Sequence, residues 1–220
     1  IKYFLLLLLI LSQHTFAQFY YFGRNKVQYD KFDWKIIRTE HFNVYYYGEM
    51  DRIAEIGSTY AEEIYDELKV KMNNVVTRKI PLIFYNTSNH FQQTNTTPGF
   101  IPEGVGGFFE FMKGRVVIPS TGSLNDFKHV IRHELVHVFM TNKIFRILRD
   151  HRLPTDEMPP LWFVEGLAEH YSTYPDAQAE MVMRDAVIND YHFGIENIWK
   201  IYGSFLMYKE GQSFLKFVEE

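Results

Sequence analysis

The chain carries two histidines and a glutamate in a pattern that suits metal chemistry. His133, Glu134 and His137 form His-Glu-x-x-His within residues 124–141, where dense apolar residues predict a largely buried helix. Residues four apart in a helix differ by about 40° around the axis and about 6 Å along it, so both imidazoles can share one ion. Glu134 is rotated by about 100° from His133 and can reach a water molecule activated by that ion. The alternative, two core histidines hydrogen-bonded to the backbone, leaves Glu134 without a role.

A later helix is expected to supply a third ligand, because a zinc hydrolase needs three protein ligands and one open position. Glu165 and Glu169 lie four residues apart within the apolar segment 161–171. Burying two carboxylates is costly unless one of them meets a cation. Glu165 as a metal ligand, with Glu169 accepting a hydrogen bond from a ligand histidine, would offset that cost. The alternative is an ordinary exposed acidic stripe.

The elements that position these residues follow from their periodicity. Strands come first and helices dominate afterwards, which predicts an α+β fold. A polar segment rich in Gly and Pro, residues 86–107, is longer than most connections, and long loops in compact domains are often functional. The expected strands are 41–47, 79–85 and 115–119, and the expected helices are 51–72, 124–141, 161–171, 177–189 and one beginning near 205.

Composition excludes several classes of function. With 220 residues, 46% of them apolar, the chain can form a globular core and is not intrinsically disordered. The formal net charge is −4 and no basic stripe is present, so we expect no nucleic-acid partner. The absence of cysteine excludes a disulfide framework, a thiolate zinc site and a cysteine nucleophile.

Residues 1–17 read as a signal peptide, with one lysine, a short apolar run and Ala17 as the expected cleavage position. The run is far shorter than the roughly 20 residues that a membrane span needs, so we expect no membrane span in the mature chain. An exported protein without cysteine indicates a bacterial periplasmic or extracellular location. Both ends of the sequence suggest the N-terminal part of a longer protein.

The combined motifs resemble a known family. His-Glu-x-x-His followed by W-x-x-E-G-x-A-x-x-Y, which spans Trp162 to Tyr171, resembles the gluzincin zinc metallopeptidases. The nearest resemblance is to the peptidase MA-like domains of exported Bacteroidetes proteins, with a more distant similarity to aminopeptidase N. It implies a lead-in at residues 18–40 and a peptidase domain at 41–220, with a possible β-propeller downstream. The 27 residues between His137 and Glu165, and Val164 in place of the usual Asn, depart from the aminopeptidase pattern.

The resemblance also assigns roles to individual residues. It implies that His133, His137 and Glu165 hold Zn²⁺, under a small mixed sheet whose edge strand lies over the active-site helix and with a mainly helical part following. Tyr208, in Tyr-Lys-Glu-Gly, would donate a hydrogen bond to the oxyanion, although a tyrosine serving only in packing remains an alternative.

The same family binds its substrate along an edge strand upstream of the metal motif. Residues 106–110 followed by 116–118 occupy the corresponding place, so Gly107, Val116 and Val117 are expected to bind substrate. His129, one turn before the first motif histidine, is expected at the surface or outside the ligand set. We therefore predict a zinc metallopeptidase that hydrolyses peptide or protein substrates through a metal-activated water, with Glu134 as general base. The alternative is a catalytically silent zinc-binding module in a cell-envelope assembly.

Overall fold

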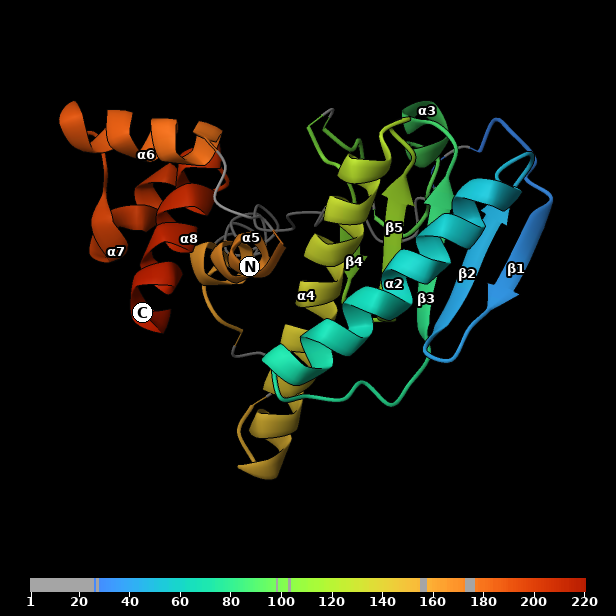
Figure 1. Ribbon diagram of the computed structural model, residues 1–220, viewed down its shortest axis with the longest axis horizontal. Helices are drawn as coiled ribbons and strands as arrows, with labels where there is room; N and C mark the ends of the chain where they lie inside the picture. The colour runs from blue at the N-terminus through green and yellow to red at the C-terminus, as the bar shows by residue number, and fades with distance from the viewer. Residues whose placement is uncertain (1–25, 27, 98, 103, 155–157, 173–176) are drawn as a thin grey trace, which may run out of the picture.

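A five-stranded mixed sheet forms one half of the molecule in the computed structural model (Figure 1). The structure describes residues 26, 28–97, 99–102, 104–154, 158–172 and 177–220. The strand order is β1-β2-β3-β5-β4, with β2, β3 and β5 parallel to one another and the two outer strands antiparallel to their neighbours. The strands are β1 (Trp34–Arg38), β2 (Phe42–Tyr47), β3 (Ile80–Tyr85), β4 (Phe108–Glu110) and β5 (Arg115–Pro119).

Two long helices, α2 (Asp51–Lys71) and α4 (Leu124–Asp150), pack against the sheet and against each other (Figure 1). The other half of the molecule is helical, and there α5 and α8 form the most extensive helix pair. The predicted α+β fold is therefore confirmed. The remaining elements are α3 (Ser88–Phe91), α5 (Leu161–Ser172), α6 (Ala177–Ile188), α7 (Gly194–Asn197), the 3₁₀ turn η2 (Ile198–Ile201) and α8 (Phe205–Glu219).

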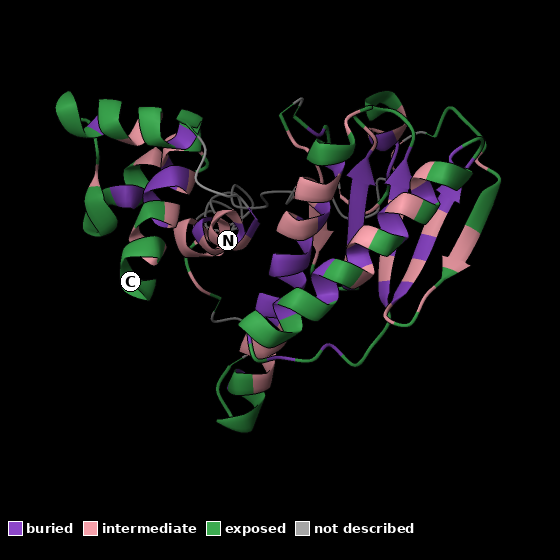
Figure 2. Cartoon of the chain, viewed as in Figure 1, coloured by how far each residue is buried: buried purple, intermediate pink, exposed green. Residues whose placement is uncertain are grey.

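The hydrophobic core lies between the central strands and the two long helices, where purple predominates in Figure 2. β2 and β3 alternate between fully buried and half-buried residues, as strands do when one face meets a core. Phe127 of α4 packs edge-on against Phe84 of β3, with ring centroids 4.9 Å apart. Phe139, three turns further along α4, packs edge-on against Tyr65 of α2 at 5.0 Å. These contacts fix how α4 is rotated about its axis.

The structure departs from the sequence-based boundaries at several places. The sheet begins at β1, inside the segment 18–40 that was expected to be only a lead-in. α4 continues to Asp150 rather than ending near residue 141. The proposed signal peptide, residues 1–17, lies outside the described residues. Within the described part of the chain, every helix is too short or too polar to cross a membrane.

The prediction that Val116 and Val117 line an exposed edge is wrong. Both are fully buried on β5, and β5 has β3 on one side and β4 on the other. Its backbone groups are therefore already paired and cannot bind an extended peptide. On this side of the sheet, the free edge among the described residues belongs to β4, which follows directly after Gly107.

Candidate metal centre

Helix α4 carries His133 and His137 on the side that faces α5, away from the residues that it turns into the core. The helix begins at an N-cap, where the Ser123 side chain accepts a hydrogen bond from the Asp126 amide at 3.2 Å. Phe127 and Ile131 are turned into the core, and this rotation directs His133 and His137 towards α5.

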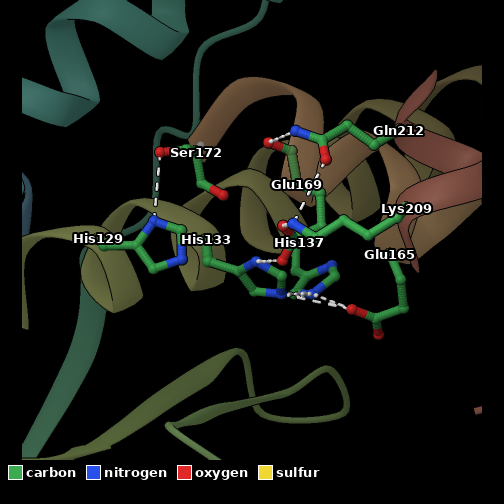
Figure 3. A network of polar contacts seen from close by, with 8 residues as sticks. All are labelled: His129, His133, His137, Glu165, Glu169, Ser172, Lys209 and Gln212. Carbon is green, nitrogen blue, oxygen red and sulfur yellow. Dashed lines mark hydrogen bonds and ion pairs between the residues drawn. The ribbon is translucent and has the colours of Figure 1, made fainter. Parts of the chain in front are cut away.

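The three predicted ligands converge on one point (Figure 3). The Nε2 atoms of His133 and His137 lie 3.3 Å apart. Oε2 of Glu165, from α5, lies 3.3 Å from Nε2 of His133 and 3.5 Å from Nε2 of His137. All three side chains are at least four-fifths buried. The structure therefore brings together a group that could hold a metal ion, and its donor atoms all face the same point.

Glu169 lies on the other side of the His133 ring, as predicted for a residue that supports a ligand. Its Oε1 is 3.4 Å from Nδ1 of His133, so the imidazole can direct Nε2 towards the ion while Nδ1 donates to a carboxylate. Its second oxygen, Oε2, accepts a hydrogen bond from Nζ of Lys209 at 2.6 Å. Gln212 adds a further contact, because its Nε2 donates to the Glu169 carbonyl oxygen at 3.3 Å. Sequence reasoning assigned no role to Lys209 or Gln212.

His129, His133 and Glu169 form a second group that could hold a metal ion. This group would use Nδ1 of His133, which already faces Glu169, and Glu169 in turn accepts from the Lys209 ammonium. Nδ1 of His129 donates to the carbonyl oxygen of Ser172 at 3.3 Å. A cation is better placed in the first group, because in the second group Lys209 already binds the Glu169 carboxylate.

The carboxylates of Glu165 and Glu169 and the imidazole of His133 shift one another's pKa values. Burial alone would raise the pKa of Glu165, but its contacts with His133 and His137 lower it to about 2. Burial likewise opposes ionisation of Glu169, but His133 and Lys209 lower its pKa to about 2. For His133, burial favours the neutral ring, while contacts with the two carboxylates raise its pKa to about 10. The centre therefore holds two carboxylates ready for a cation.

Glu134 is buried beside the candidate ligands but does not belong to their group. It is 5% exposed, and burial raises its pKa against the opposing effect of His137 and His133. Among the described residues, no hydrogen-bond partner reaches Oε2 of Glu134 or Nδ1 of His137. A buried carboxyl with an unsatisfied oxygen and a raised pKa is suited to accepting and returning a proton.

Tyr208 of α8 is half-buried in the same electrostatic environment. Burial raises the pKa of its phenol to about 12, and the negative charges of Glu165, Glu169 and Glu134 add to the effect. The phenol therefore stays protonated at neutral pH and can donate a hydrogen bond without carrying a charge.

A close crossing of two helices brings Tyr208 and Lys209 to the candidate metal centre. Gly166 of α5 and Gly211 of α8 meet so closely that a Cβ on Gly166 would lie 2.6 Å from the carbonyl carbon of Gly211 and 2.8 Å from its Cα. Gly166 follows Glu165 directly in sequence, so this close contact lies beside the candidate metal centre. The two glycines were part of the sequence motifs, but their role in packing was not predicted.

The edge strand β4 runs beside α4 close to the metal motif. A Cβ on Gly107 would lie 2.9 Å from Cγ1 of Val130 and 3.1 Å from the Val117 carbonyl oxygen. Val130 lies about one turn before the first ligand histidine, so Gly107 allows the start of β4 to approach the helix there. Gly107 thus lies next to the free edge, as predicted, whereas Val116 and Val117 do not.

Comparison with known proteins found no match for the chain among family models, curated proteins or solved structures. The function is therefore inferred from the chemistry of this centre.

Proposed function

We propose that the chain is a zinc metallopeptidase domain of the gluzincin type, with His133, His137 and Glu165 as the zinc ligands. The separation of the three donor atoms carries this proposal. Ligands at about 2.0–2.1 Å from a tetrahedral zinc ion are about 3.3–3.4 Å apart, and the three observed separations are 3.3, 3.3 and 3.5 Å. Little movement is therefore needed to bind the ion.

The types of donor support zinc as the metal. Two imidazoles and one carboxylate form a set found in catalytic zinc sites, where three protein ligands leave a fourth position open. Magnesium and calcium favour six or more oxygen ligands, whereas this group offers two imidazole nitrogens and one carboxylate. Zinc held there would polarise the carbonyl group of a peptide bond and make a water molecule more acidic.

The protein side chains would carry out the proton transfers. Glu134 takes the proton of the attacking water and later passes it to the leaving nitrogen, which suits a buried carboxyl with a raised pKa. Tyr208 donates a hydrogen bond to the carbonyl oxygen as negative charge develops on it. The free edge of β4 can pair with an extended peptide through backbone hydrogen bonds. Together with the signal peptide predicted for residues 1–17, this supports cleavage of peptides or proteins outside the cytoplasm.

The substitution Glu134→Gln tests the proposal, because it removes the base and leaves all three ligands in place. We expect the variant to retain one zinc ion per chain, measured by mass spectrometry of the bound metal. Its hydrolysis of a library of internally quenched peptides should fall by about 10²–10⁴-fold, the usual contribution of a general base. Glu180→Gln, a matched change at an exposed position on α6, should leave both measurements unchanged.

Two results would count against the proposal. Unchanged turnover in Glu134→Gln would show that Glu134 is not the base. Zinc-loaded wild-type protein that cleaves no peptide of the library would favour the silent zinc-binding module instead.

A further inference from the structure

Lys209 of helix α8 is buried, and lysine side chains are seldom buried in proteins. The Lys209 side chain is only 4% exposed, and a buried ammonium group is costly unless it meets an anion. Its Nζ lies 2.6 Å from Oε2 of Glu169, a short and charge-assisted hydrogen bond. Within the proposed mechanism, this ammonium neither binds the metal nor touches the substrate.

Gln212, one turn further along α8, fixes the geometry of this pair (Figure 3). Its Oε1 accepts from Nζ of Lys209 at 3.4 Å, and its Nε2 donates to the backbone carbonyl of Glu169 at 3.3 Å. The ammonium is therefore held against α5 by a side chain that also binds the α5 backbone. This arrangement restricts the movement of both charged groups.

The Glu169 carboxylate links this pair to the metal centre. Because Oε2 is held by Lys209, the carboxylate plane is fixed and Oε1 is directed towards Nδ1 of His133, 3.4 Å away. A carboxylate that accepts from Nδ1 of a metal-ligating histidine orients the ring and increases its basicity. A series of contacts therefore links Gln212 to Lys209, Lys209 to Glu169, and Glu169 to the imidazole of His133.

We propose that Lys209 is a positioning residue of the metal centre, which holds Glu169 in the orientation that supports His133 and thereby strengthens zinc binding. The inference rests on the proposed zinc site and extends it to a residue on α8. A purely structural role, in which Lys209 only joins α8 to α5, predicts a loss of stability without a specific loss of zinc affinity.

The substitution Lys209→Met separates the two roles, because it keeps an unbranched apolar side chain of nearly the same length and removes the ammonium. We expect the zinc dissociation constant, measured by competition with a chromophoric chelator, to rise about tenfold, at the lower end of the range for outer partners of metal ligands. Lys209→Arg, which can still donate to Glu169, should restore most of the affinity. Lys216→Met, an exposed position two turns along the same helix, should leave the affinity unchanged.

A double substitution tests whether Lys209 acts through Glu169. Glu169→Gln alone should weaken zinc binding by about 10–100-fold, and adding Lys209→Met should change the affinity by less than about twofold, because the partner is already lost. The absorption spectrum of the cobalt-substituted protein should shift in Lys209→Met and not in Lys216→Met.

The inference about Lys209 can fail while the proposed peptidase function stands, and the experiments separate the two cases. If wild-type protein binds zinc and Lys209→Met binds it equally tightly, the inference is wrong while the proposed function stands. An undiminished effect of Lys209→Met in the Glu169→Gln background would also overturn it. A protein without zinc affinity in any form would overturn the proposed function and this inference together.

Discussion

We expect Gly166→Ala to force α5 and α8 apart and so weaken the metal centre. The added Cβ would lie 2.6 Å from the carbonyl carbon of Gly211, 2.8 Å from its Cα and 3.0 Å from the amide nitrogen of Gln212. Carbon atoms in contact are normally about 3.5–4.0 Å apart, so relief requires a shift of about 1 Å. All three obstructing atoms belong to the backbone of α8. No side-chain rotation can relieve the clash, and the helix itself must move.

The net effect on stability follows from two opposing contributions. Alanine in a helix is favoured over glycine by about 1 kcal/mol. Overpacking a close contact costs about 1–3 kcal/mol, and backbone obstruction places this site near the upper end. We therefore expect the free energy of unfolding to fall by about 1–2 kcal/mol. The same movement lengthens the 2.6 Å contact between Lys209 and Glu169, so zinc affinity should fall as well.

Urea unfolding and the chelator competition assay measure the two effects on the same sample. Ser213→Ala, at an exposed position of α8, provides the control, because there alanine only improves helix propensity and should stabilise by a few tenths of a kcal/mol. A Gly166→Ala protein as stable as the wild type, with unchanged zinc affinity, would refute the role assigned to this crossing. Gly211→Ala should be at least as damaging, since its Cβ would collide with the carbonyl oxygen of Trp162.

Two further predictions concern the Tyr208 phenol of the candidate metal centre and the contact between His41 and Glu62. Tyr208→Phe should lower kcat by about 10²–10³-fold with little change in KM, because it removes a donor needed mainly in the transition state; an equal rise in KM would instead indicate a substrate-binding role. The carboxylate of Glu62 contacts Nδ1 of His41 at 2.6 Å, and although burial opposes it, hydrogen bonds from His41 and Thr39 lower its pKa. This pair should therefore stabilise the fold above the unfolded pKa of Glu62, and the stabilisation should be lost as pH falls through the lower pKa of the folded state. Urea titrations of Glu62→Gln and wild type should differ at pH 7 and converge in acid, and a difference that persists in acid would contradict this origin.

Much of the fold could be predicted because its signals are local. Periodic apolar residues identified α2, α4, α5 and α8, and runs of β-branched and aromatic residues identified β2, β3 and β5. His133 and His137 of α4 could be paired for the same reason, since helical geometry alone directs residues four apart to one side. β1 was missed because Trp34–Arg38 is exposed or half-buried throughout and so lacks the alternation of a strand with one buried face.

The sequence itself indicated that β5 is not an edge strand. Val116, Val117 and Ile118 are consecutive apolar residues, and all three are fully buried. A continuous apolar run is typical of a strand with parallel neighbours and cover on both faces, whereas an exposed edge usually carries polar residues. The run therefore indicated an interior position for β5, and the shorter segment before it was the better candidate for the edge.

Contacts between helices far apart in the sequence could not be predicted from any local pattern. Lys209 and Glu169 are 40 positions apart and meet only because α5 and α8 cross at two glycines. The crossing also accounts for the composition of both motifs. On α5 a glycine follows the metal ligand Glu165, and on α8 another glycine lies two residues after Lys209. A bulkier residue at either position would hold the helices too far apart for a lysine on one to reach a carboxylate on the other at 2.6 Å. The glycines of the two motifs are therefore required together, because each one provides the space that the other occupies.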